Sequence, residues 1–233
     1  MGLKEGGLRG SLRNVSVEIE AAIPDSEDLH ARWSAKGLEL SDQDSVNSWE
    51  DETGNGHDLT AGSAPTFITD GINGNPAVRF DGTNNYLDVA FSALSQPNNI
   101  YAVFRYRSIN NDNDTLYDAE ADPSDRNLFN QPSNDDFRIF AGEALDGGNA
   151  DTNPHISSAL FNGSSSTHRI DGAEVASGDA GTESLDGFTV GANRGDANNA
   201  PIDIGEILIY PEDKSGIQSD VEQYLSSEWA ISL

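Results

Sequence analysis

Paired carboxylates are the part of this sequence that comes nearest to a catalytic arrangement. Retaining glycoside hydrolysis needs two carboxylates about 5–5.5 Å apart, one acting as nucleophile and the other as acid and base. The nearest match is Glu120, Asp122 and Asp125, in the run Glu-Ala-Asp-Pro-Ser-Asp. Pro123 and the lack of alternating apolar neighbours predict a loop, which would not hold a nucleophile rigidly. We therefore expect no catalytic residues and a protein that is not an enzyme; a hydrolase acting through Glu120 and Asp122 is the alternative.

Hard oxygen ligands are more plentiful than catalytic groups. Asp112 and Asp114 lie in the Asn- and Asp-rich run 110–114, and Asp136 follows a second polar turn. Because Ca²⁺ prefers carboxylate and carbonyl oxygens, these three aspartates are the predicted calcium ligands. The alternative is a solvated acidic surface. Cysteine is absent, which excludes disulfides and thiolate metal sites.

Two aromatic side chains lie close to predicted turns. Tyr86 and Tyr117 are predicted to stack on sugar rings at the rim of the fold. The alternative is that both tyrosines pack at the rim and contact no ligand.

The elements that must position these residues are predicted to be short strands. Hydrophobic runs recur between clusters of Gly, Asn and Asp. They occupy 15–20, 29–33, 45–49, 76–80, 86–89, 99–107, 135–140, 156–161, 167–170, 188–192 and 202–210. The runs 76–80 and 86–89 flank a turn as a hairpin would, and 99–107 is the predicted central strand. Segments 108–135 and 141–155 are predicted long loops. The recurrence of short strands along the chain indicates an all-β sandwich or jelly roll.

One helix is predicted at the C-terminal end of the sequence. Apolar residues recur at helical spacing from Ile217 to Trp229, and Ser215 is placed to cap the first turn. We expect the apolar stripe of this helix to pack on the sandwich.

Several motifs then combine in one order. Trp-x-Asp-x-x-Gly-Asn-Gly-x-Asp-Leu lies over 49–59 and Asn-Gly-x-Pro-Ala-Val-x-Phe-Asp-Gly over 73–82. An Asp-Gly hairpin, the strand Ile-x-Glu-Ile-Leu-Ile-Tyr and the terminal Tyr-Leu-x-x-x-Trp follow. Over residues 29–233 the chain resembles the laminin-G-like members of the concanavalin A-like superfamily. The resemblance implies a jelly-roll sandwich of two antiparallel sheets, a fold shared by lectins, enzymes, adhesion modules and capsid proteins.

The polar residues within these motifs are expected to have structural tasks. Asp51 and Asp81 can accept backbone N–H hydrogen bonds and brace their loops. Glu206, on an otherwise apolar strand, is expected to bind an arginine or a loop amide. The glucanases of the superfamily use Glu-x-Asp-x-x-Glu, and the run from Glu120 to Asp125 departs from that pattern at its last position.

Charge is the strongest signal in the composition. Forty acidic residues against thirteen basic ones give a net charge of -27. Self-repulsion at that charge destabilises a compact fold, and molar salt removes most of it by shrinking the Debye length to about 3 Å. We therefore expect a halophilic protein that does not bind nucleic acid directly. No apolar run reaches the roughly 20 residues of a membrane span.

The first residues differ from the rest of the sequence. Residues 1–14 carry Lys4, Arg9 and Arg13 against one acid, and four glycines make the segment flexible. We predict a basic assembly arm ahead of a laminin-G-like domain over 15–233, which docks on an acidic neighbour such as another copy of the chain. The alternative is a frayed terminus. The arm also resembles the starts of proteins from haloarchaeal viruses.

Two functions from different classes are consistent with these features. The first is a non-enzymatic structural or attachment protein of a halophilic virus, in a capsid or tail projection at the virion surface. It would form a homo-oligomer, contact other virion proteins and touch host cell-surface glycans. The alternative is a carbohydrate-binding or adhesion module of a haloarchaeal cell-surface protein. The only cofactor that we expect is Ca²⁺.

Overall fold

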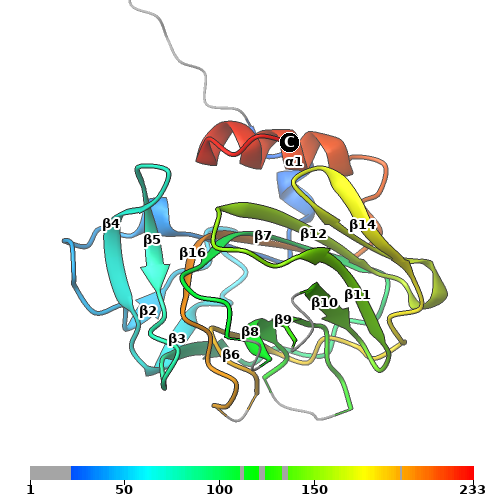
Figure 1. Cartoon of the computed structure of the whole chain (residues 1–233), viewed down its shortest axis with the longest axis horizontal. Coiled ribbons are helices and arrows are strands. Elements are labelled where there is room, and N and C mark those ends of the chain that lie inside the picture. The colour runs from blue at the N-terminus through cyan, green and yellow to red at the C-terminus, as the bar shows by residue number, and fades with distance from the viewer. Residues whose placement is uncertain (1–21, 111–112, 121–123, 133–135, 195) are drawn as a thin grey trace, which may run out of the picture.

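The structure is a computed structural model that describes residues 22–110, 113–120, 124–132, 136–194 and 196–233. Two antiparallel sheets face each other, and an α-helix lies over one of them (Figure 1). This architecture confirms the prediction of an all-β jelly-roll sandwich with a C-terminal helix. The strand predicted over 15–20 and the arm residues Lys4, Arg9 and Arg13 lie outside the described residues.

The first sheet has the strand order β14-β13-β12-β7-β16-β5-β4, and β1 also pairs with β16. Its strands are β1 (Ala31–Ser34), β4 (Thr66–Ile72), β5 (Asn75–Arg79), β7 (Asn98–Tyr106), β12 (His155–Phe161), β13 (Ser166–Ile170), β14 (Ala173–Gly178) and β16 (Ile202–Tyr210). The long strands β7 and β16 pair over most of their length at the centre of this sheet. The prediction of a central strand over 99–107 is therefore confirmed.

The second sheet has the order β11-β10-β9-β8-β15-β6-β3-β2. Its strands are β2 (Ser48–Trp49), β3 (Leu59–Ser63), β6 (Tyr86–Val89), β8 (Asp114–Asp118), β9 (Leu128–Gln131), β10 (Asp136–Phe140), β11 (Ala144–Asn149) and β15 (Phe188–Val190). Among the described residues, three short 3-10 helices lie in connections: η1 (Ser26–Asp28), η2 (Ala35–Gly37) and η3 (Gly163–Ser165).

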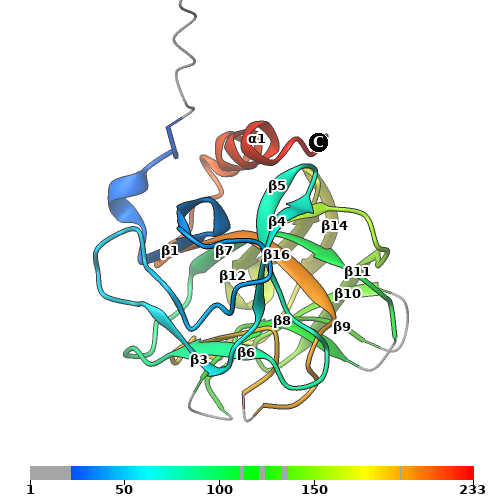
Figure 2. The ribbon, with the colours of Figure 1, turned by 90° about the vertical axis from the view of Figure 1, so that its left-hand side faces the viewer.

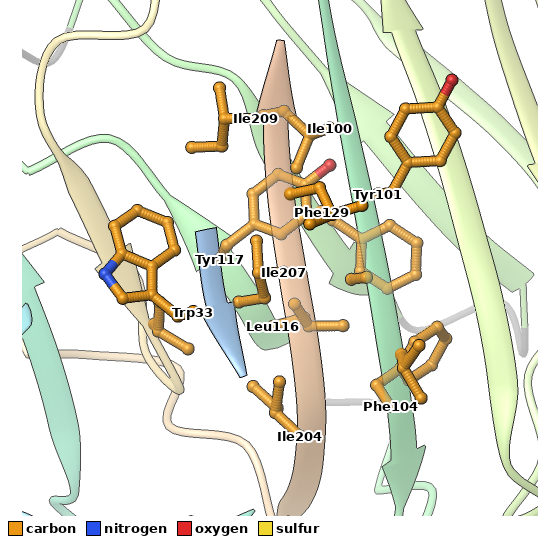
Figure 3. Packing of buried hydrophobic residues seen from close by; sticks show 14 of the residues in the cluster. Trp33, Ile100, Tyr101, Phe104, Leu116, Tyr117, Phe129, Ile204, Ile207 and Ile209 are labelled. Carbon is orange, nitrogen blue, oxygen red and sulfur yellow. The ribbon is translucent and has the colours of Figure 1, made fainter. Parts of the chain in front are cut away.

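The core lies between the two sheets and follows from the alternation of side chains along each strand. Ile204, Ile207 and Ile209 of β16 belong to one buried cluster with Tyr117 and Phe129 of the second sheet (Figure 3). All five side chains are fully buried. Because alternate residues point the other way, the outer faces of the sheets carry the polar side chains that can form sites.

The helix α1 (Gln218–Trp229) packs on the outer face of the first sheet, on the side away from β3 and β6 (Figures 1 and 2). Val221, Leu225 and Trp229 are buried, as the apolar stripe predicts. The predicted cap by Ser215 is wrong. The helix begins at Gln218, and Ile217 precedes it without a side-chain cap. Ser215 lies further upstream, inside a turn that the N–H of Ile217 closes by bonding to Lys214 O.

The predicted hairpin between 76–80 and 86–89 is also wrong. β5 lies in the first sheet and β6 in the second, so the turn between them passes from one sheet to the other. β5 already pairs with β4 on one side and with β16 on the other. It therefore has no free edge that β6 could join.

The predicted long loops over 108–135 and 141–155 contain three strands, β8, β9 and β11. β8 and β9 are buried strands with Asp, Asn and Gln at several positions, which weakens the hydrophobic alternation that marks a strand. β11 is an edge strand that contains Gly147 and Gly148, residues of low β-propensity.

Candidate functional site

A cleft of about 460 Å³ opens beside β1 and the short edge strand β2. Its size falls in the range of roughly 300–1,000 Å³ that is usual for small-molecule sites. The lining is Ser34, Gly37, Leu38, Glu39, Leu40, Ser45, Asn47, Ser48, Trp49, Glu50 and Glu52. One wall is formed by the end of β1 and the segment up to Leu40, and the other wall includes β2 of the second sheet.

Asp51 fixes the wall that carries Trp49 and Glu52. Its carboxylate accepts hydrogen bonds from the backbone N–H groups of Arg32 (3.1 Å), Thr53 (3.0 Å) and His57 (3.2 Å). Burial raises the pKa of Asp51, but these hydrogen bonds outweigh burial and hold the pKa below its usual value. The predicted bracing role of Asp51 is confirmed. The bond to Arg32 also ties this loop to β1, so both walls of the cleft are held together.

Glu52 stands at the end of the cleft against the backbone of η2. Its Oε2 atom lies 2.5 Å from the guanidinium of Arg32, and its Oε1 atom occupies the space that a side chain at Gly37 would need. Burial raises the pKa of Glu52, the charge of Arg32 opposes that shift, and the nearby carboxylates Glu206 and Asp51 add to it. The carboxylate is therefore positioned from two sides.

Arg32 links the cleft to the helix through Glu206. The Glu206 carboxylate is 1% exposed and accepts from Arg32 Nε at 2.8 Å, from Tyr224 Oη at 3.2 Å and from Trp229 Nε1 at 2.8 Å. This confirms the prediction that Glu206 is a structural partner of an arginine. Beyond Glu52, a second hollow of about 320 Å³ runs from the cleft towards the helix. It is lined by Ile23, Arg32, Ser34, Lys36, Gly37, Glu52, Tyr224 and Glu228.

The cleft offers mixed chemistry to a ligand. Hydroxyl, amide and carboxylate groups stand beside Leu38, Leu40 and the ring of Trp49. Trp49 is 1% exposed, and its indole N–H has no hydrogen-bond partner in the described part of the chain. The Trp49 ring is therefore a buried part of the wall, whereas Ser45, Asn47 and Ser48 of the lining are exposed and can reach a ligand.

The two tyrosines predicted to contact sugars are not brought together at this cleft. Tyr86 is half-buried on β6, and its ring lies against the backbone of Gly62 on β3. Tyr117 is fully buried in the core, where its ring contacts Phe129 and Phe188 at centroid distances of 5.8 and 5.3 Å. The predicted sugar contact at Tyr117 is wrong, because the residue lies on an inward-facing position of β8 and not at a rim.

Two of the three predicted calcium ligands, Asp114 and Asp136, lie in the described part of the chain. Asp114 begins β8, is 4% exposed and accepts a hydrogen bond from Asn110 Nδ2 at 3.2 Å, whereas Asp136 begins β10. Asp112 lies outside the described residues, as does Asp122 of the carboxylate run. Among the residues that the structure describes, no group of three or more His, Cys, Asp and Glu could hold a metal ion. The calcium site remains a prediction.

The residues that line the cleft were missed as a site, because nothing in the sequence separates them from the many other acidic and polar residues of the chain. Trp49 and Glu52 lie inside the first motif, where only loop bracing was expected. Three acids, Glu39, Glu50 and Glu52, stand within a short span around one tryptophan. The described helices do not include one with the length and apolar character to cross a membrane.

Comparisons with known proteins find relatives in structure but not in sequence. No family model matches the chain, and no curated protein matches it. Among solved structures, the Trypanosoma rangeli sialidase in complex with sialic acid aligns at 14% identity and a TM-score of 0.64. That alignment covers 91% of this chain and 35% of the sialidase.

Two further structures share the sandwich. Domain 4 of AbnA, an extracellular arabinanase from Geobacillus stearothermophilus, in complex with arabinotriose, aligns at 18% identity with a TM-score of 0.55. The alignment covers 84% of this chain and 98% of that domain. The receptor binding domain of a botulinum neurotoxin C/D mosaic serotype aligns at 10% identity and a TM-score of 0.63, over 87% of this chain and 52% of that one. At these identities the likeness shows a common fold, and the chain spans about a third of the sialidase and half of the toxin domain.

Proposed function

We propose that this chain is a carbohydrate-binding module and that the cleft beside Trp49 takes a neutral oligosaccharide. The observation that carries the proposal is the lining of the cleft, where exposed hydroxyl, amide and carboxylate groups stand beside the half-buried side chains of Leu38 and Leu40. Sugars present many hydroxyls around apolar ring faces. A site with several polar groups beside leucine side chains complements both features.

The comparisons support this class of function. The arabinanase domain, which this chain matches over nearly the whole length of that domain, was solved with arabinotriose. The sialidase was solved with sialic acid, although this chain corresponds to only about a third of it. Because a shared fold hosts several functions, the proposal for this chain rests on its own cleft and takes only support from these proteins.

Electrostatics favours a neutral sugar over an acidic one. Glu39, Glu50 and Glu52 line the cleft, and the whole chain carries a net charge of -27. The positive charge of Arg32 is already matched by Glu52 and Glu206. An anionic sugar would meet like charges at this site, whereas the carboxylates can accept hydrogen bonds from the hydroxyls of a neutral sugar.

The decisive experiment compares binding by matched glycine variants. Gly37→Ala would displace the Glu52 carboxylate, and since Gly37 does not have a left-handed backbone conformation, the added methyl acts mainly through this contact. Gly216→Ala is the control, because a side chain there meets no atom within 4 Å. Titration calorimetry with arabinotriose and a panel of neutral oligosaccharides should show binding by the original chain and by Gly216→Ala. Gly37→Ala and Glu52→Gln should bind about tenfold more weakly.

Either of two results would contradict the proposal. The first is that no neutral oligosaccharide binds to the original chain at millimolar concentration. The second is equal binding by the Gly37→Ala variant, by Glu52→Gln and by the original chain, which would place any sugar site elsewhere. Sialic acid serves as the charged comparison and should bind to this cleft more weakly than the neutral sugars, so any binding of it should not depend on Gly37 or Glu52.

A narrower proposal concerns where the module works. The basic residues Lys4, Arg9 and Arg13 and the net charge of -27 favour a surface protein of a halophilic virus, in which the sandwich contacts glycans of the host. In that case the arm mediates assembly and the cleft mediates attachment. Truncation of residues 1–14 should then change the oligomeric state without changing the affinity for sugar.

A further inference from the structure

Three arginines converge on one buried carboxylate on the outer face of the first sheet. Asp203 of β16 is fully buried and stands directly opposite Arg79 of β5 on one side and Arg105 of β7 on the other. Arg107 follows two residues after Arg105 and therefore projects from the same face. Since Ile202 and Ile204 point into the core, Asp203 and its partners lie on the side away from the second sheet.

The contacts around Asp203 are short and directional. Arg79 binds both carboxylate oxygens, with its Nε 2.7 Å from Oδ1 and its Nη2 2.9 Å from Oδ2. Arg105 Nη2 donates to Oδ2 at 2.6 Å. Arg107 stands further away, with its Nε 3.6 Å from Oδ1, and donates from Nη2 to the backbone oxygen of Phe80 at 2.6 Å.

This number of arginines exceeds what a buried carboxylate needs. In the described part of the chain, the other buried carboxylates with an arginine partner have one each, namely Asp118 with Arg126, Glu206 with Arg32 and Glu222 with Arg169. Around Asp203 the positive charges exceed the negative charge by two. Clustered like charges repel one another, which makes the arrangement costly unless a further anion is present.

The neighbouring acids offset this excess only at the edges of the cluster. The negative charge of Asp42 helps to raise the pKa of Arg79, but the Asp42 carboxylate also accepts a hydrogen bond from the backbone N–H of Thr69 at 3.0 Å. The negative charge of Asp81 favours the charged form of Arg107, but the Asp81 carboxylate also accepts hydrogen bonds from the backbone N–H groups of residues 83–85. Asp42 is therefore held against β4, and Asp81 is held in its own turn.

We propose that Arg79, Arg105 and Arg107 form a binding site for an oxyanion: a carboxylate, sulfate or phosphate group. The three side chains are 30–31% exposed, while Asp203 beneath them is closed to solvent and holds their inner edges. A guanidinium has five N–H donors in a planar fork, more than these contacts occupy, and matches the geometry of an oxyanion. β5 and β7 hold Arg79 and Arg105 in place before the anion arrives, and the bond to Phe80 O holds Arg107, which follows β7 directly. This site is separate from the cleft and does not depend on the proposed function.

The test is the thermal stability of the full chain as chloride is exchanged for an oxyanion at constant ionic strength, near 1 M so that the net negative charge is screened. Potassium sulfate, potassium phosphate and potassium glucuronate are three separate arms, which distinguish free inorganic anions from the carboxylate of a sugar acid. Sulfate and phosphate also stabilise proteins in general by exclusion from their surface. The informative quantity is therefore the difference between the original chain and a variant.

Arg107→Gln is the main variant, because its contact with Asp203 is the longest and its loss leaves the other two ion pairs in place. Arg138→Gln is the control, since that arginine pairs with Asp146 elsewhere on the surface and is 27% exposed. We expect at least one oxyanion to raise the melting temperature of the original chain and of Arg138→Gln more than that of Arg107→Gln. The apparent affinity of Arg107→Gln should be about tenfold lower.

In chloride alone, Arg107→Gln should be at least as stable as the original chain, because removal of one guanidinium relieves repulsion. An equal response to all three anions in the original chain and in both variants would overturn the proposal. Destabilisation of Arg107→Gln in chloride with no difference in the anion response would also overturn it, and would assign the third arginine to structure.

Discussion

Alanine at Gly205 should loosen the helix from the sheet. Gly205 lies in β16 where the register against β7 shifts between Ile204 and Glu206, and the ring of Trp229 packs directly on its backbone. A Cβ atom at this position would lie 2.6, 2.8 and 2.9 Å from three atoms of the Trp229 ring. The ring, and with it the C-terminal end of α1, would have to move outward.

The size of the effect follows from that overlap. Carbon atoms in good contact lie about 3.5–4.0 Å apart, so the ring must shift by nearly 1 Å. Overpacking of this kind costs about 1–3 kcal/mol, and the lower entropy of the unfolded chain offsets about 0.4–1 kcal/mol of it. A net loss of about 1–2 kcal/mol should lower the melting temperature by about 2–8 °C in a chain of this size. Movement of Trp229 also weakens its hydrogen bond to Glu206.

Denaturant unfolding monitored by tryptophan fluorescence measures this loss. Gly216→Ala is the matched control, because its Cβ would meet no atom within 4 Å, and it should be as stable as the original chain. In a Trp229→Leu background the Gly205→Ala substitution should cost much less, since the smaller side chain leaves room for the methyl group. If Gly205→Ala proves as stable as Gly216→Ala, or costs the same with and without Trp229, the packing described for this helix is wrong.

Four further outcomes follow from the charges and the chain ends. Because the net charge is -27, the free energy of unfolding should rise as KCl increases towards molar concentration, and flat dependence would contradict a halophilic protein. Burial lowers the pKa of His155, but Asp171 and Asp151 outweigh burial and raise it above the ordinary 6.5. The contribution of protonated His155 to the free energy of unfolding should be complete below pH 6.5 and lost as the pH rises through the higher folded pKa. His155→Asn should remove this pH dependence when the free energy of unfolding is measured from pH 5 to 9. If the predicted calcium site exists, Ca²⁺ should raise the melting temperature relative to EDTA, and Asp136→Asn should abolish that difference. Light scattering in molar KCl should show an oligomer that dissociates when residues 1–14 are removed, and a monomer in both cases would refute the predicted assembly arm.

The strands that the sequence predicts best are the long central ones, which are buried on both faces. β16 and β7 are long, rich in branched and aromatic residues, and lie at the centre of a sheet, so local pattern and tertiary environment agree. The Asp-Gly turn at 171–172 connects β13 and β14 as a hairpin, with both residues at positive φ. In these segments the information needed for the structure is local.

The sheet that a strand joins is not determined by the local sequence of that strand. β5 and β6 are joined by a short turn and resemble a hairpin in sequence, but β5 is held by β16, whose residues come more than a hundred positions later. The preference of β5 for that partner depends on contacts such as Arg79 with Asp203, which no local pattern contains. Pattern alone therefore identifies the strands but does not assign them to sheets.

The candidate sites depend on such long-range contacts even more strongly than the fold does. In the cleft, Glu52 acquires its position from Gly37 and from Arg32, while Arg32 is oriented by Glu206 on a distant strand. In sequence, Glu52 is one of forty acidic residues and has no property that separates it from the others. Arginine is rarer in this chain, so the run Arg105-x-Arg107 on a predicted strand was a usable signal for a charged outer face. An uncommon residue type at alternate strand positions is thus a better guide to a site in this protein than any of its acidic clusters.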